Sequence, residues 1–326
     1  MSSNGIPPNP RILAVRLGAM GDLIHTLPAV AELKRAFPGS RLTWAVEPQW
    51  AALLEGNPFL DRVLLLRRAS GAGLLESWRS LRAERYDVAV DFQGLLKSAV
   101  VAAAARPSRI FGFDPAQVRE RAASLFYSDR IAAGGVHMVE LNCSLAAAVT
   151  GNPATGPYEF PLPPGRPEGA LPEGEFVLAS PLAGWRSKQW PSEHYRSLAG
   201  RLRRELGIPL VLNGREASHL PAIEDALPHV SGLPGLIYAT RRAAAVLGVD
   251  SGPLHIAAAL GKPGVAIFGP TDPARNGPYG GSLRVLRRPG SVTTYRRGSE
   301  IDESMKHISP DQVFEELRAA LSCAVR

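Results

Sequence analysis

Short apolar runs alternate with helix-like patterns along nearly the whole chain, and this alternation limits the possible folds more than any other feature. In the first half, strands are expected at 11–17, 42–46, 62–66 and 88–91, with helices at 22–37, 49–54, 74–84 and 95–105. Alternation of this kind is typical of a parallel sheet with helices on both faces. The first half is therefore expected to be a doubly wound α/β domain.

A proline- and glycine-rich stretch, Gly151–Gly174, interrupts the alternation with seven prolines. No regular element tolerates that composition, so the stretch predicts a linker. Strands are then expected at 176–180, 209–213, 245–249 and 264–268, with helices at 192–206, 218–226 and 253–260. We expect a first domain at 1–155, a linker at 156–174, a second domain at 175–309 and a final helix at 310–326 that can pack back on the first domain.

The composition is that of an ordinary globular protein. Of the 326 residues, 45% are hydrophobic and 21% are charged, which is enough apolar material for two cores. No apolar run approaches the roughly 18 residues of a membrane helix, and the N-terminus lacks the apolar segment of a signal peptide, so a cytoplasmic location is expected. The two cysteines, Cys143 and Cys323, are too few for a disulfide framework or a cysteine-ligated zinc site.

The net charge of +7 has two explanations. It can indicate a polyanionic partner such as a diphosphate or a phosphorylated lipid, and a GC-rich genome can also produce an arginine-rich chain without any ligand. The excess is spread evenly over both halves, which argues against a nucleic-acid-binding arm. No Asp-x-Asp pair occurs in the sequence, which argues against a divalent ion held by paired carboxylates. Neither a metal nor another cofactor is expected.

The first candidate loop follows the first strand and runs from Gly18 to Gly21, with Asp22 and His25 after it. Ligands of open α/β sheets bind beyond the carboxyl ends of the strands. The loop lacks the third glycine of a dinucleotide fingerprint and the lysine of a phosphate-binding P-loop. Asp22 can act as a base at the start of the following helix, or it can simply cap that helix.

The second candidate loop contains Asp250, Ser251, Gly252 and His255, between an expected strand and a helix. The free N–H groups of a helix start suit a diphosphate, and Gly252 allows close approach of the backbone. Capping for Ser251 and a packed helix position for His255 are the alternatives. A Ser-His-Asp triad is disfavoured because Ser251 does not lie in a Gly-x-Ser-x-Gly turn.

A third segment, Arg186–Pro191, lies between a strand and a helix of the second half. Lys188 within it could neutralise phosphate oxygens, or it could be a solvated loop lysine. The loop from Gly269 to Pro273 could line the same site.

Six blocks of sequence together resemble the lipopolysaccharide heptosyltransferases of glycosyltransferase family 9, with the greatest likeness to the heptosyltransferase I group. They cover nearly the whole chain and comprise residues 21–28, 91–98, 119–127, 188–191, 249–255 and 269–273. The resemblance implies a GT-B fold, in which two Rossmann-like doubly wound domains face each other across a cleft. It also implies an inverting glycosyltransferase.

The same resemblance implies a role for each matching residue. Asp22 would be the catalytic base, and the donor-binding residues would be Lys188, Ser187, Asp250, Ser251, Gly252 and His255. The acceptor-binding residues would be Gly21, His25, Arg67, Arg68, Lys97 and Arg119, although the basic residues among them could equally be solvated surface side chains. The implied donor resembles ADP-heptose, the implied acceptor is a phosphorylated Kdo-lipid A, and peripheral contact with the inner membrane is compatible with such an acceptor.

Two departures from the family pattern affect these expectations. Ala183-Gly184 stands where the family commonly has two threonines facing the donor phosphates, and Leu141 stands where a basic residue is expected. Ser187 or backbone amides could substitute for the lost hydroxyls. The alternative functions are a GT-B transferase or epimerase that uses another nucleotide-sugar, and a non-catalytic nucleotide-sugar-binding protein of the same fold.

Overall fold

The computed structural model describes residues 5–153, 156–294 and 296–324 and divides into two units. The first unit ends at Pro163 and the second begins at Pro164, inside the proline-rich stretch. Each unit is a continuous length of chain built around its own six-stranded sheet. Among the described residues, no helix is both long enough and apolar enough to cross a membrane.

The sheet of the first unit is parallel throughout and has the strand order β3-β2-β1-β4-β5-β6. Its strands are β1 (Arg11–Val15), β2 (Arg41–Val46), β3 (Arg62–Leu65), β4 (Val88–Asp91), β5 (Arg109–Phe113) and β6 (Asp129–Ile131). Its helices are α1 (Met20–Ile24), α2 (Leu27–Ala36), α3 (Gly71–Arg82), α4 (Leu96–Ala104) and α5 (Met138–Thr150), with 3₁₀ helices η1 (Pro48–Leu54) and η2 (Arg121–Phe126).

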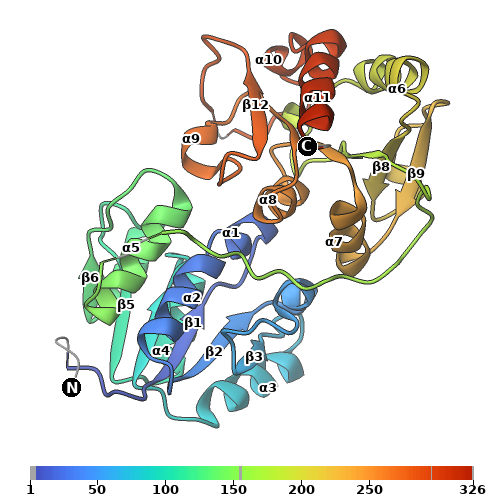
Figure 1. Ribbon diagram of the computed structural model, residues 1–326. Coiled ribbons are helices and arrows are strands. Elements are labelled where there is room, and N and C mark those ends of the chain that lie inside the picture. The colour runs from blue at the N-terminus through green and yellow to red at the C-terminus, as the bar shows by residue number, and fades with distance from the viewer. Residues whose placement is uncertain (1–4, 154–155, 295, 325–326) are drawn as a thin grey trace. The chain divides into compact units, whose positions relative to one another are not determined.

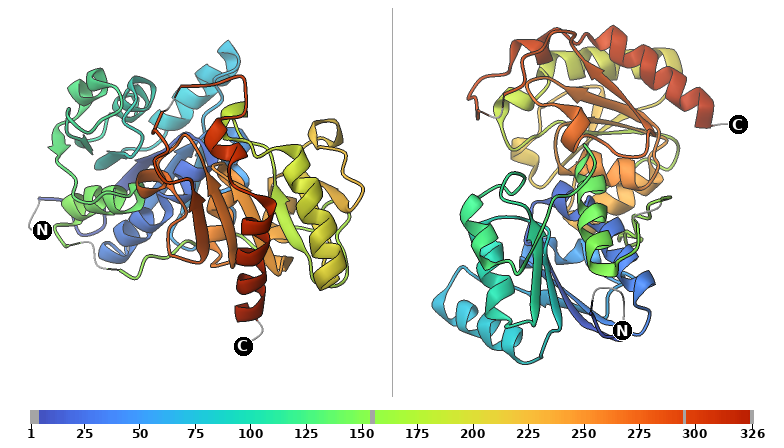
Figure 2. Two further views of the ribbon diagram at one scale, coloured as in Figure 1. Left: turned by 90° about the horizontal axis from the view of Figure 1, so that it is seen from above. Right: turned by 90° about the vertical axis from the view of Figure 1, so that its left-hand side faces the viewer.

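Helices cover both faces of this sheet. Helices α2 and α5 pack side by side (Figure 1). Helix α4 contacts α3 and η2. In the right-hand view of Figure 2, the sheet stands between α5 in green and α3 in light blue. The central strands are therefore buried on both sides, which explains why β1 is an almost continuous apolar run, with only Arg11 exposed.

The second unit repeats this topology with the order β12-β11-β10-β7-β8-β9. Its strands are β7 (Val177–Ser180), β8 (Leu210–Gly214), β9 (Ala226–Val230), β10 (Ala245–Val249), β11 (Gly264–Phe268) and β12 (Leu283–Arg287). Its helices are α6 (Ser192–Leu206), α7 (Leu233–Arg242), α8 (Gly252–Ala259), α9 (Pro273–Asn276), α10 (Glu303–Lys306) and α11 (Pro310–Ala324), with 3₁₀ helices η3 (Arg186–Lys188) and η4 (Ala217–His219).

The final helix, α11, packs within the second unit. Val313, Phe314 and Leu317 are fully buried in the core that the second sheet shares with α6. Figure 2 shows α11 in red beside α6 in yellow-green. The expected return of this helix to the first domain is not what buries its apolar face, which lies in the core of its own unit.

Two expected helices differ from the observed ones because of proline. The helix expected at 22–37 is broken into α1 and α2, since Pro28 has no N–H to bond the carbonyl of Ile24. The described residues 218–226 hold no α-helix, only the end of the short 3₁₀ helix η4, so the prediction of a helix over this range is wrong. Pro221 interrupts the segment, and Ala226 instead begins the edge strand β9, which tolerates a proline at position 228.

Candidate functional sites

Each sheet has a topological switch point, where the connections that follow two neighbouring parallel strands run toward opposite edges of the sheet. In the first unit this point lies between β1 and β4, and in the second between β7 and β10. Open α/β sheets bind their ligands at the carboxyl ends of these strands. Asp22 follows β1, Lys188 follows β7 and Asp250 follows β10, so the expected residues lie at the switch points of their own sheets.

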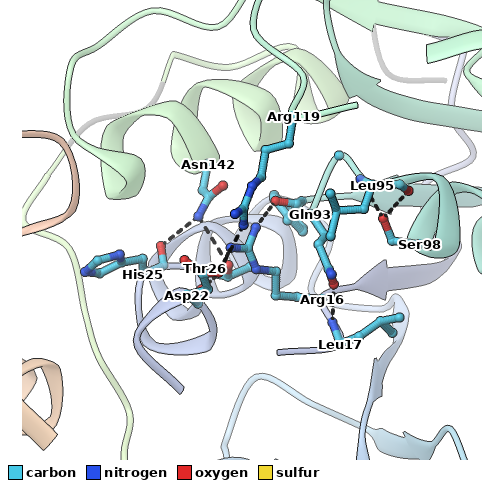
Figure 3. Close-up of polar contacts among 12 residues, drawn as sticks. Arg16, Leu17, Asp22, His25, Thr26, Gln93, Leu95, Ser98, Arg119 and Asn142 are labelled. Carbon is cyan, nitrogen blue, oxygen red and sulfur yellow. Dashed lines mark hydrogen bonds and ion pairs between the residues drawn. The ribbon is translucent and has the colours of Figure 1, made fainter. Parts of the chain in front are cut away.

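Asp22 lies in the first turn of α1 and forms an ion pair with Arg16, whose Nη2 is 2.6 Å from Asp22 Oδ2. The Arg16 side chain is 2% exposed, and its Nη1 donates to the carbonyl of Phe92. A second guanidinium, that of Arg119, approaches the same Asp22 oxygen at 3.8 Å (Figure 3). The Asp22 side chain is 27% exposed. The buried Arg16 therefore orients this carboxylate, which remains accessible to solvent.

The capping alternative for Asp22 does not describe this helix. The N-cap residue of α1 is Ala19, and Asp22 is three residues further on. Its carboxylate is instead held by two arginines, which leaves it available for chemistry with a ligand.

The loop after β4 fixes the position of Arg16 and of the glycine loop. Gln93 Oε1 accepts from the backbone N–H of Leu17 at 2.8 Å (Figure 3). The buried carboxylate of Asp91 accepts from Tyr127 Oη at 2.7 Å, from Ser98 Oγ at 2.9 Å and from the Gln93 N–H at 2.9 Å. Burial raises the pKa of Asp91, and these three hydrogen bonds oppose that shift. A satisfied buried network of this kind makes the loop rigid. We call Arg16, Asp22, Gln93 and Arg119 the Asp22 cluster.

His25 does not present its ring to the surface, although the resemblance implied an acceptor contact. The residue is 3% exposed, and its imidazole lies edge-on to His137 with ring centroids 4.9 Å apart. Asn142 Nδ2 donates to the His25 carbonyl at 3.0 Å and to Thr26 Oγ1 at 3.2 Å. His25 therefore helps to pack α1 against α5.

Two of the expected basic residues gather around one glutamate. Arg68 pairs with Glu47, and Lys97 Nζ lies 3.8 Å from the same Glu47 oxygen. A Cβ atom added to Gly18 would lie 3.8 Å from the other Glu47 oxygen, so the group adjoins the glycine loop before Asp22. Arg67 differs, because its guanidinium is directed to a carboxylate of α3 at 3.7 Å.

In the second unit, Lys188 and Asp250 come together from positions 62 residues apart. Lys188 Nζ is 2.6 Å from Asp250 Oδ2, and Thr271 Oγ1 donates to the same oxygen at 2.7 Å. Lys188 also lies over the ring of Trp185, 4.2 Å from its centroid. We call Ser187, Lys188, Asp250 and Thr271 the Lys188 cluster. The lysine is only 15% exposed, so it is not the solvated loop lysine of the alternative interpretation.

Hydroxyl groups and a helix start adjoin this ion pair. Ser251 precedes α8, but its side chain makes no capping hydrogen bond to the helix. Within the described residues, the buried Oγ atoms of Ser187 and Ser251 have no hydrogen-bond partner. Such groups are costly unless something satisfies them, as the oxygen atoms of a ligand would. Gly252 is half-buried at the helix start, whereas His255 is buried at 6% exposure within α8.

Three residues of these sites were not expected from the sequence, namely Arg16, Gln93 and Glu47. Arg16 is a charged residue at the end of an otherwise apolar strand run, which was the available signal. Glu47 directly follows β2, and Gln93 is the second residue after β4. Among the described residues, no group of three or more His, Cys, Asp or Glu side chains could hold a metal ion.

Comparison with known proteins gives a consistent match. A model of "Glycosyltransferase family 9 (heptosyltransferase)" matches residues 74–301. Lipopolysaccharide heptosyltransferase 1 of Escherichia coli K12 is 32% identical over 307 residues, which cover 86% of this chain and 94% of that protein. The protein of the same name from Pseudomonas aeruginosa is 33% identical over 300 residues, covering 83% of this chain and 82% of the relative.

Solved structures agree with this match. The E. coli heptosyltransferase WaaC with ADP-2-deoxy-2-fluoro heptose has a TM-score of 0.77 at 27% identity and covers 95% of this chain and 99% of its own. E. coli ADP-heptose lps heptosyltransferase II shares the fold with a TM-score of 0.77 at 23% identity. The expectation of a GT-B α/β fold with two parallel sheets is confirmed.

Proposed function

The chain belongs to glycosyltransferase family 9, the heptosyltransferases, and from this membership we propose that it transfers a heptose from ADP-heptose to an inner-core acceptor of lipopolysaccharide with inversion at the anomeric carbon. The relatives named lipopolysaccharide heptosyltransferase 1 and the WaaC complex with an ADP-heptose analogue support this choice of substrates.

One observation carries the proposed chemistry, namely the Asp22 carboxylate held in place by a buried arginine and still accessible to solvent. Asp22 takes the proton of the acceptor hydroxyl while that oxygen attacks the anomeric carbon of the donor. The bond from the anomeric carbon to the diphosphate breaks, and ADP leaves. Because the attack is a single direct displacement, the configuration at the anomeric carbon inverts.

The Lys188 cluster supports the proposal that the second unit holds the donor. The Lys188 ammonium can stabilise the negative charge that develops on the departing diphosphate. The hydroxyls of Ser187 and Ser251 can donate to phosphate oxygens, and Gly252 at the start of α8 allows the phosphates to approach backbone N–H groups.

Exposed basic side chains support acceptor binding on the first unit. Arg119 lies beside Asp22, and Arg68 and Lys97 gather near the glycine loop that leads to Gly21. Arginine and lysine are the side chains best suited to phosphate groups on a lipid-linked saccharide. Arg67 joins this set if its weak contact with α3 opens.

The proposal also places the enzyme in the cytoplasm in peripheral contact with the inner membrane, and helix α3 supports the contact. Leu74 is 56% exposed, Leu75 is 50% exposed and Trp78 is 40% exposed. Arg79 and Arg82 lie in the last turn of the same helix, with the Arg82 guanidinium 4.2 Å from the centre of the Trp78 ring. Apolar side chains flanked by arginines suit the interface of an anionic membrane.

The Asp22→Asn variant tests the proposed base. Asparagine cannot accept the proton, so we expect the turnover number for heptose transfer to fall by about 10² to 10⁴. Donor affinity should stay within about three-fold, because the base acts on the acceptor in the transition state. Transfer is measured with ADP-heptose and a Kdo-lipid A acceptor, and donor affinity by calorimetric titration.

The loss of charge also leaves Arg16 buried without its carboxylate, so unfolding in urea must be measured for the same variant. Asp22→Glu is the matched control, because it keeps the negative charge beside Arg16 and moves the carboxylate by about one bond length. It should remain folded and lose most of its activity. A folded Asp22→Asn enzyme with more than about a tenth of the wild-type turnover would refute the assignment of Asp22 as base.

A further inference from the structure

The charge of Lys188 is largely matched by its own neighbour. Its Nζ is 2.6 Å from Asp250 Oδ2, and both side chains are about 15% exposed. The diphosphate of a nucleotide-sugar carries a negative charge on each phosphate. A single lysine that is also paired with a carboxylate cannot neutralise all of that charge, and the residues at 183 and 184 are alanine and glycine and have no hydroxyl to add. Binding of the diphosphate therefore requires a second cation in this site.

The chain between β12 and α10 packs against the loops that carry the Lys188 cluster. The backbone N–H of Asp302 donates to the Ser187 carbonyl at 3.3 Å, and that of Thr294 donates to the Pro270 carbonyl at 2.7 Å. A Cβ atom added to Gly298 would lie 3.1 Å from Ser187 Cβ. These contacts place the described part of this segment beside both loops of the donor site.

The segment also brings a guanidinium to the ring under Lys188. Arg297 Cζ lies 5.7 Å from the centroid of Trp185, and Lys188 Nζ lies 4.2 Å from the same centroid. An aromatic ring attracts cations within about 6 Å of its centre, so Trp185 holds both groups in one neighbourhood. Within the described residues, no carboxylate forms an ion pair with Arg297. The charge of Arg297 is therefore not matched as that of Lys188 is.

We propose that Arg297 is the second cation of the donor site and binds the diphosphate together with Lys188. The proposal rests on the function proposed above, since it assigns a further residue to the same site. Arg297 is exposed, so it can swing from the Trp185 ring onto a phosphate with its planar fork of N–H donors. The ring keeps the guanidinium near the site before the ligand arrives.

The test compares ADP and adenosine binding to the full-length protein by calorimetric titration. Arg297→Gln should weaken ADP binding by about three- to ten-fold, because the charge-assisted contact is made at a partly solvated position. It should leave adenosine binding unchanged. The ADP affinity of this variant should also depend less on salt concentration than that of the wild type.

Arg296→Gln is the matched control, because it removes the same charge from the neighbouring exposed residue, whose guanidinium is not among the groups near the Trp185 ring in the described chain. It should bind ADP like the wild type. If Arg297→Gln binds ADP with wild-type affinity and salt dependence while Lys188→Ala binds it weakly, the second cation is refuted and the donor site stands. Equal losses for Arg296→Gln and Arg297→Gln would also refute it, as they would indicate only a general effect of net charge. Failure of the wild type to bind ADP would overturn the donor proposal and this inference together.

Discussion

The ion pair between Lys188 and Asp250 makes the loss of the lysine more harmful than the loss of a single contact. Without Lys188, the Asp250 carboxylate retains Thr271 as a donor and faces the diphosphate with an unmatched negative charge. We expect Lys188→Ala to weaken ADP binding by about ten- to a hundred-fold, from a charge-assisted hydrogen bond worth about 1.5–3 kcal/mol. Calorimetric titration with ADP and with the intact nucleotide-sugar measures this loss.

Two further variants separate the effect of the Lys188 charge from other contributions to ADP binding. Lys188→Ala combined with Asp250→Asn removes the repulsion and should recover part of the lost affinity. His255→Ala should cost at most about ten-fold, because a neutral hydrogen bond contributes about 0.5–1.5 kcal/mol. An ADP affinity unchanged in Lys188→Ala would remove the lysine from the phosphate site.

Single residues differ in how far the sequence could predict their place. Asp22, Lys188 and Asp250 each follow an apolar strand run, and strand ends at a switch point are where ligands bind, so their positions could be expected. The side chains that contact these three residues could not be predicted from the sequence. Arg16 meets Asp22 because the loop after β4 offers the Phe92 carbonyl to its other nitrogen, and that contact depends on the register of β1 against β4.

Whole elements were predictable where the apolar pattern was strong and uninterrupted. The strands β1, β2, β4, β10 and β11 and the helices α4 and α6 agree with the expected ranges to within about two residues. Other elements were not expected from the sequence, among them β5, β6, β9, β12, α5 and α7. The edge strands β9 and β12 are as long as the central strands but have only two buried residues each, so they lack the continuous apolar run of a central strand.

Helix α3 gives a prediction about membrane contact. The double variant Leu74→Ser with Trp78→Ser removes two exposed apolar side chains without touching the buried side of the helix, formed by Gly73, Ser77 and Leu81. We expect binding to vesicles that contain phosphatidylglycerol to fall by about ten-fold, because membrane affinity scales with the apolar area buried in the interface. Co-sedimentation with the vesicles measures the bound fraction.

The second unit offers a matched control, a pair of exposed apolar residues. Leu227 is 45% exposed and Val230 is 38% exposed, both on the edge strand β9. Replacing these two by serine should leave vesicle binding as it is in the wild type. Equal binding by the α3 variant and the wild type would exclude α3 as the contact surface.

At the scale of the whole molecule, each unit has its own sheet and its own buried core. The contacts of Lys188 with Asp250, and of Asp250 with Thr271, lie entirely within the second unit. We therefore expect residues 164–326, produced alone, to fold and to bind ADP within about three-fold of the affinity of the full chain. Circular dichroism establishes folding, and calorimetric titration measures the affinity.

The Lys188→Ala change in this isolated fragment serves as the control and should reduce ADP affinity as it does in the full chain. A fragment that folds but does not bind ADP would show that donor binding requires the first unit. In that case the assignment of the donor to the second unit alone would be wrong.

The division of the chain at Pro163 also bears on how the protein is made. All six strands of the first sheet, and every helix of that unit, are encoded before residue 164. Ribosomes deliver the N-terminal end first, so the early half can complete its core while the later half is still being translated. The two units, which are of similar length, can thus fold one after the other during synthesis. A nascent chain stalled shortly after the proline-rich stretch has cleared the exit tunnel should already resist protease.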